Sequence, residues 1–201
     1  MTETVELLFD FVSPNAYLVW KPLKALAARH GTAIKVTPVF LGGMHKLTGN
    51  APPMVRDAEV KGKNAYAMLE MRRFIAKHGL DRFTMNPGFP FKSITLQRML
   101  VAVSQEQRIA MIDALLPPIW ERGMDVTDTD EVATALALAG LDADALAAKA
   151  QDAAVKQLLA DATDDAVARG AFGIPTVWVG DEMFFGKERL AQIDEALDSA
   201  A

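Results

Sequence analysis

Ser13 is the residue whose type and position are best suited to chemistry. It follows the apolar segment at residues 5–12 and precedes Pro14. Serine is a preferred helix N-cap and proline fits the first helical turn, so this pair predicts a helix from residue 14. The N–H groups and the dipole at a helix N-terminus attract an anion. A hydroxyl there can donate to a thiolate and lower the pKa of its thiol, or it can simply begin a helix.

The chain contains no cysteine and three histidines, His30, His45 and His78. Without cysteine there is no disulfide, no thiolate metal ligand and no internal sulfur nucleophile. Thiol chemistry at Ser13 therefore requires a thiol from another molecule. The histidines form neither an i, i+4 pair nor an HExxH pattern, so a protein-bound metal is not expected.

A second candidate feature is the segment Gly173-Ile174-Pro175-Thr176. Because proline removes a ladder hydrogen bond, Pro175 belongs at the beginning of the following strand. Its placement favours a cis peptide bond. If this segment faces the N-terminus of the first helix, Ile174 can pair its backbone with an extended cysteinyl peptide, as an added strand does.

The order of elements decides whether these two segments meet. Residues 5–12 and 33–40 are typical strands on either side of the first helix, which ends near Gly31, so they form a βαβ unit. Helical patterns then dominate the middle of the chain. We expect helices at 56–79, 92–104, 105–122, 129–139, 142–148 and 151–169.

β character returns near the C-terminus, where 174–180 and 182–186 indicate a hairpin followed by a helix from Lys187 to Leu197. The order βαβ, helices, ββα predicts an α/β thioredoxin-like fold with a large all-helical insertion. The thioredoxin-like domain would comprise residues 1–41 and 170–201, and the inserted helical domain residues 42–169. A ligand is expected in the cleft between them.

Composition limits the classes of partner. The 201 residues are 51% hydrophobic and 23% charged, with a net charge of −5. These values are typical of a globular protein, and no apolar run is long enough to span a membrane. The basic residues are scattered, so no nucleic-acid partner is expected. The N-terminal segment has neither a basic region nor a cleavage site, and cytoplasmic localisation is therefore expected.

Six short motifs along the chain resemble those of a known family and occur in the same order. They are DFVSPNAYL at 10–18, GNAPP at 49–53, Lys63 three residues before Tyr66, MNP at 85–87, FGIPT at 172–176 and FFGKERL at 184–190. Together they resemble 2-hydroxychromene-2-carboxylate isomerases, which belong with the kappa-class glutathione transferases in the DsbA-like branch of the thioredoxin superfamily. The resemblance spans nearly the whole chain.

The resemblance implies a glutathione-dependent isomerase that interconverts 2-hydroxychromene-2-carboxylate-type substrates and trans-o-hydroxybenzylidenepyruvate by reversible thiolate addition. Glutathione would be the cofactor, the substrate a small aromatic carboxylate from aromatic degradation, and the enzyme a homodimer. Ser13 would be catalytic and would hydrogen-bond the glutathione sulfur. Further residues are implied to bind glutathione, namely Asn50, Lys63, Ile174, Pro175, Lys187 and Glu188, and Lys63 and Asn86 to bind substrate.

Two positions depart from the family pattern. Lys187-Glu188 stands where the family typically has Ser-Asp or Asn-Asp for the γ-glutamyl group, although Glu188 keeps an anion for the ligand's ammonium. Lys92 stands where family members often have Asn. The γ-glutamyl contacts and the substrate pocket are therefore expected to differ from those of relatives.

Other interpretations remain open. The same scaffold suits a kappa-type glutathione transferase or peroxidase, or a non-catalytic binding protein. Asn50 before two prolines can shape a turn, and Lys63 can belong to a solvated helix face. Glu188 suits the first turn of the last helix with or without a ligand, and Asn86 can end a loop.

Overall fold

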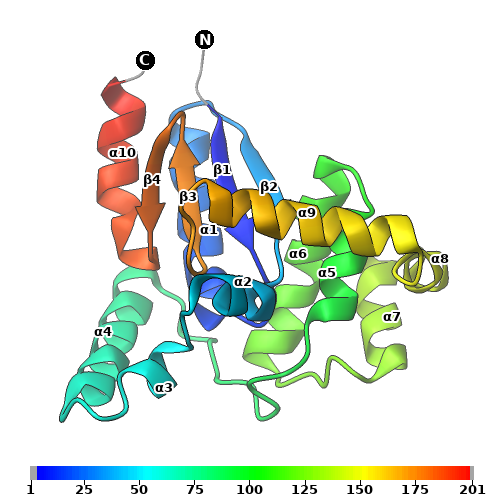
Figure 1. The fold of residues 1–201 in the computed structure, drawn as a ribbon, viewed down its shortest axis with the longest axis horizontal. Helices are drawn as coiled ribbons and strands as arrows, with labels where there is room; N and C mark the ends of the chain where they lie inside the picture. Colours follow the sequence, from blue (N-terminus) through cyan, green and yellow to red (C-terminus); the bar gives the residue numbers. More distant parts are fainter. Residues whose placement is uncertain (1–3, 200–201) are drawn as a thin grey trace.

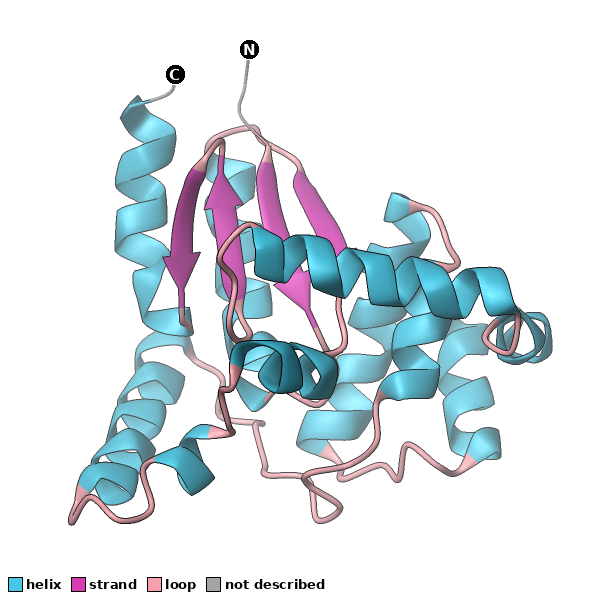
Figure 2. Cartoon of the chain, in the orientation of Figure 1, coloured by secondary structure: helices cyan, strands magenta, loops and turns pink. Residues whose placement is uncertain are grey.

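A mixed four-stranded sheet forms the centre of the fold. The computed structural model describes residues 4–199. The strands are β1 (Val5–Phe9), β2 (Ile34–Pro38), β3 (Thr176–Val179) and β4 (Glu182–Phe185). Their order is β2-β1-β3-β4, with β1 parallel to β2 and antiparallel to β3, and β3 antiparallel to β4. Figure 2 shows the sheet in magenta.

Helices cover both faces of this sheet. Helix α1 (Pro14–Arg29) connects the two parallel strands and lies behind the sheet in Figure 1. It contacts α10 (Leu190–Ser199), which stands at the left of β4 in the same view. The 3₁₀ turn η1 (Lys187–Arg189) leads into α10. Helices α2 and α9 contact each other and lie in front. This arrangement confirms the predicted thioredoxin-like fold with its helical insertion.

Eight helices lie between β2 and β3 in the described part of the chain. They are α2 (Leu41–Thr48), α3 (Pro53–Arg56), α4 (Lys63–His78), α5 (Ile94–Val101), α6 (Gln105–Glu121), α7 (Thr129–Leu138), α8 (Ala143–Lys149) and α9 (Ala153–Ala168). We call residues 53–78 the α3–α4 arm, which lies at the lower left of Figure 1. No helix within residues 4–199 is long and apolar enough to cross a bilayer.

The core joins the sheet to the helical segment. Four of the five residues of β1 are buried, as expected for a central strand covered on both faces. The indole of Trp120 on α6 is also buried, and its Nε1 donates to the Phe11 carbonyl over 3.1 Å. Side chains from both parts form one connected cluster. The domain boundaries at residues 41/42 and 169/170 stay a prediction.

Some predicted elements differ from the structure. The strands predicted at 5–12 and 33–40 end earlier, at Phe9 and Pro38. The helix predicted at 56–79 begins only at Lys63, as α4, and Gly62 before it has a positive φ of 85° that favours glycine. The short helix α3 was not predicted. Helix α2 was not predicted.

Candidate functional site

Ser13 caps α1, as the sequence predicts. Its backbone is extended, at φ −87° and ψ 113°, and Pro14 occupies the first helical position. The Ser13 Oγ accepts from the Ala16 N–H over 3.2 Å. The side chain is buried, at 4% exposure. A hydroxyl is thereby fixed at the N-terminus of a 16-residue helix, where the dipole favours negative charge.

The second predicted segment meets Ser13 directly. The Ser13 Oγ donates to the Ile174 carbonyl over 3.4 Å, across 161 positions of sequence. The Ile174–Pro175 peptide bond is cis, as predicted. Ile174 precedes β3, which begins at Thr176, so its N–H lies outside the ladder of the sheet. Sequence reasoning therefore placed the helix start and the proline-led strand together correctly.

Asn50 lies beside the segment that leads to the cis-proline. It follows Gly49, the left-handed residue that ends α2. The Asn50 Nδ2 donates to the Phe172 carbonyl over 2.7 Å, and its Oδ1 accepts from the Ala51 N–H over 2.8 Å. Asn50 thus shapes its own turn and also holds the chain just before Ile174.

Lys63 begins α4 and is held within the α3–α4 arm. Its Nζ contacts the Asp57 Oδ1 over 2.9 Å, and the Arg56 Nε contacts the same oxygen over 2.9 Å. Hydrogen bonds from Arg56 and then Lys63 hold the pKa of Asp57 far below its ordinary value. Half of the Lys63 side chain remains exposed, so its ammonium can still meet a ligand carboxylate.

Lys187 and Glu188 form an ion pair with each other. The Lys187 side chain is 6% exposed, and its Nζ lies 5.4 Å from the centroid of the Phe74 ring of α4. The Glu188 side chain is 45% exposed, and its Oε1 accepts from the Lys187 Nζ. Any ligand ammonium at Glu188 must share this carboxylate with a buried lysine.

The side chain of Asn86 hydrogen-bonds to the main chain of its own loop and of the segment at the end of α6. It is buried, and its Nδ2 donates to the carbonyls of Ile119 and Met124 over 2.9 Å each. Its Oδ1 accepts from the Gly88 N–H over 2.8 Å. Both amide hydrogens are therefore used by main-chain acceptors, and substrate binding by Asn86 stays a prediction. Lys92 is exposed.

Sequence reasoning did not assign a role to Asp10. This carboxylate is fully buried three residues before Ser13. Burial raises its pKa from 3.8 to about 6, against hydrogen bonds from Ser93 and from the N–H groups of Leu41 and Val12. The available signal was an acidic residue interrupting the apolar strand VELLFDFV.

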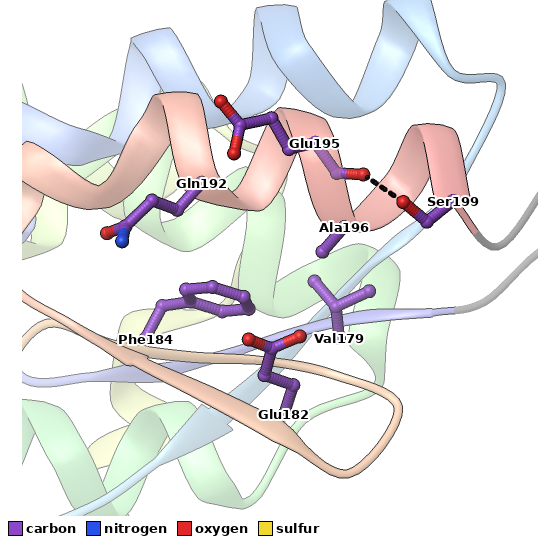
Figure 3. Close-up of a pocket in the computed structure, with 7 residues that line it drawn as sticks. All are labelled: Val179, Glu182, Phe184, Gln192, Glu195, Ala196 and Ser199. Carbon is purple, nitrogen blue, oxygen red and sulfur yellow. Dashed lines mark hydrogen bonds between the residues drawn. The ribbon is translucent and has the colours of Figure 1, made fainter.

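Ser13 lines neither of two surface grooves. Figure 3 shows one between β4 and α10, where Phe184 and the Glu182 carboxylate lie across from Ala196. It includes Val179, which pairs with Val5 at the end of the sheet far from Ser13. The other lies between α1 and α6. The second groove therefore lies between the two predicted parts of the chain. Neither groove contains a predicted site residue, so a ligand cleft at Ser13 stays a prediction.

Comparisons with known proteins agree with this geometry. A family model described as a DSBA-like thioredoxin domain matches residues 4–198. A 2-hydroxychromene-2-carboxylate isomerase from Sphingobium xenophagum is 32% identical over 197 residues, covering 98% of this chain and 99% of the relative. Glutathione S-transferase kappa 1 from Rattus norvegicus is 28% identical, with coverage of 92% and 87%.

A solved structure of a 2-hydroxychromene-2-carboxylate isomerase matches with a TM-score of 0.81 at 25% identity, covering 98% of this chain and 95% of that chain. The chain belongs to the DsbA-like thioredoxin family. Within this family it groups with the 2-hydroxychromene-2-carboxylate isomerases and the related kappa-class glutathione transferases, which confirms the resemblance seen in the sequence.

Proposed function

We propose that this protein is a glutathione-dependent isomerase that interconverts 2-hydroxychromene-2-carboxylate-type substrates and trans-o-hydroxybenzylidenepyruvate. The observation that carries the proposal is the Ser13 hydroxyl, which caps α1 and contacts Ile174 beside the cis-proline. The relatives of this chain support the choice of reaction, because it is similar to 2-hydroxychromene-2-carboxylate isomerases over nearly its whole length.

The residues fit glutathione as a cofactor. A buried hydroxyl at a helix N-terminus suits a sulfur anion, and the chain has no cysteine of its own. Bound glutathione would supply a thiol nucleophile that is regenerated at the end of each turnover. The Ser13 O–H would turn from the Ile174 carbonyl to donate to the sulfur, and the freed backbone of Ile174, beside Pro175, would hold the cysteinyl group.

The remaining predicted residues would bind the ends of the ligands. Asn50 would contact glutathione next to Phe172, and the ammonium of the half-exposed Lys63, now paired with Asp57, would hold a carboxylate of glutathione or of the aromatic substrate. Glu188 would receive the γ-glutamyl ammonium while it stays paired with Lys187. By fixing glutathione and the substrate in the reactive orientation, these residues would lower the activation barrier of thiolate addition.

A kappa-type transferase is the second candidate, favoured by the similarity to the rat enzyme. The two activities differ in what happens to glutathione. We expect the purified protein to isomerise the chromene substrate with no net loss of glutathione. Stoichiometric consumption of glutathione with an electrophile such as a chlorinated nitroaromatic, without isomerisation, would favour the transferase. The absence of any glutathione binding would refute both.

We further propose a homodimer that uses the α3–α4 arm. Five large apolar side chains are exposed there or beside it, namely Met54 (58%), Val55 (68%), Val60 (55%), Tyr66 (58%) and Met68 (42%). Exposed apolar side chains gathered on one segment of the chain are typical of an interaction surface. We expect Val55→Asp to yield monomers in analytical ultracentrifugation. The control Leu138→Asp changes a residue 87% exposed on α7 and should leave the dimer intact. A monomeric wild type would refute this proposal.

A cytoplasmic location is proposed on the sequence alone and can be tested by cell fractionation.

A further inference from the structure

One buried carboxylate connects the segments that surround Ser13. The Asp10 Oδ1 accepts from the Val12 N–H over 3.1 Å, and its Oδ2 accepts from the Leu41 N–H over 2.9 Å. The Ser93 hydroxyl donates to the same carboxylate. The Asp10 main-chain carbonyl also accepts from the Ser13 N–H over 3.1 Å. Asp10 therefore determines the turn that presents Ser13.

The same carboxylate supplies a cap that α2 lacks. Phe40, the N-cap residue of α2, has no side-chain acceptor for the first N–H groups of the helix. Asp10 accepts from Leu41, and the Thr163 Oγ1 of α9 accepts from the Phe40 N–H over 3.0 Å. The start of α2 is thus held by acceptors from two other elements.

Helix α2 in turn leads back to Ser13. It ends at Gly49, and the next residue, Asn50, donates to the Phe172 carbonyl. Phe172 lies two residues before Ile174, whose carbonyl accepts from the Ser13 Oγ. Covalent chain and hydrogen bonds therefore form a closed ring that passes through Asp10, α2, Asn50, Ile174 and Ser13.

We propose that Asp10 is a positioning residue that holds Ser13 and the Asn50–Ile174 side of the site in register. This inference rests on the proposed function for its catalytic consequence. Asp10 acts through the turn that it fixes, and it faces N–H donors with both oxygens. An asparagine of the same shape would turn an amide hydrogen toward one of these donors, because only one of its two terminal atoms accepts. The variant would then lose either the bond to Val12, which fixes the turn before Ser13, or the bond to Leu41, which closes the ring.

The test compares Asp10→Asn with Thr163→Val. Thr163→Val removes only an acceptor at the start of α2, whereas Asp10→Asn removes one acceptor from a side chain that holds both the start of α2 and the turn before Ser13. We expect Asp10→Asn to lower kcat about tenfold or more, because a shift of about 1 Å in a catalytic group has effects of this order. We also expect it to raise the pKa of the enzyme-bound thiol, followed by the ultraviolet absorbance of the thiolate. Thr163→Val should keep both values near those of the wild type.

Hydrogen exchange of the protein without glutathione reports directly on the Val12 and Leu41 N–H groups that Asp10 holds. Faster exchange at Val12 or at Leu41 in Asp10→Asn, with slower turnover, is the expected result. Wild-type kcat and thiol pKa in this variant would overturn the proposal, as would an equal loss in Thr163→Val. If Asp10→Asn does not fold, Ser93→Ala removes one donor to the carboxylate and should give a smaller change in the same direction. No change in Ser93→Ala would then overturn it. A wild type that neither binds glutathione nor isomerises substrate would refute the proposed function, while the exchange data would still report on the ring.

Discussion

Replacing Ser13 with alanine separates its structural role from its proposed chemical role. The Ser13 Oγ caps α1 through the Ala16 N–H and donates to the Ile174 carbonyl. Loss of an N-cap costs about 1 kcal/mol of stability. Loss of a donor to a developing anion raises the barrier by about 3 kcal/mol, which slows turnover about a hundredfold. The variant should therefore remain folded and be nearly inactive.

Ser104→Ala provides a matched control for the cap. The Ser104 Oγ accepts from the Gln107 N–H over 3.3 Å at the start of α6, within a capping box. We expect both variants to lose about 1 kcal/mol in chemical denaturation, and only Ser13→Ala to lose turnover at saturating glutathione. The thiol pKa of bound glutathione should rise in Ser13→Ala. A loss of turnover smaller than about threefold would remove Ser13 from the mechanism.

Three further predictions follow from the described contacts. Burial raises the pKa of Asp10 to about 6, so between about pH 4 and 6 the folded state holds a proton that the unfolded state releases. The free energy of unfolding should therefore fall by about 3 kcal/mol as the pH rises from about 4 to 7. Denaturation across this range should show that trend in the wild type and not in Asp10→Asn, and parallel curves would contradict it. Gly173→Ala should cost about 1–3 kcal/mol in thermal denaturation, because its Cβ would lie 2.7 Å from the Phe185 ring, and unchanged stability would show that the ring moves freely. Glu188→Gln should weaken glutathione binding about tenfold in calorimetry and leave Lys187 without its carboxylate, whereas unchanged affinity would place the γ-glutamyl group elsewhere.

The part of the site that the sequence predicted depends on local chemistry. Ser13-Pro14 identifies a helix start from residue types alone, and Pro175 identifies a strand beginning. The order of strands then brings these two segments together. This explains why the contact between Ser13 and Ile174 was accessible to prediction although 161 positions separate them.

The parts that were missed depend on tertiary contacts. Helix α2 contains Gly42 and Gly43, which disfavour a helix in isolation. In the fold a Cβ at either glycine would lie 3.1 Å from the Phe40 ring, a tight contact that glycine avoids. The bonds from Asp10 and Thr163 to the start of α2 join elements far apart in sequence. No local pattern reports such contacts.

Two predicted ligand residues have partners that their motifs do not reveal. Asn86 donates to two carbonyls near the end of α6, and Lys187 is buried against Phe74. A motif records residue types and spacing, whereas the surroundings of a side chain depend on how distant helices pack. The sequence therefore locates the residues but leaves their present hydrogen bonds undetermined.

A crystal structure of the protein soaked with glutathione tests the central claim most directly. The proposed function predicts the glutathione sulfur within about 3.5 Å of the Ser13 Oγ, with the cysteinyl backbone paired to Ile174. Glutathione bound elsewhere, for example in the groove between β4 and α10, or a sulfur turned away from Ser13 would contradict it.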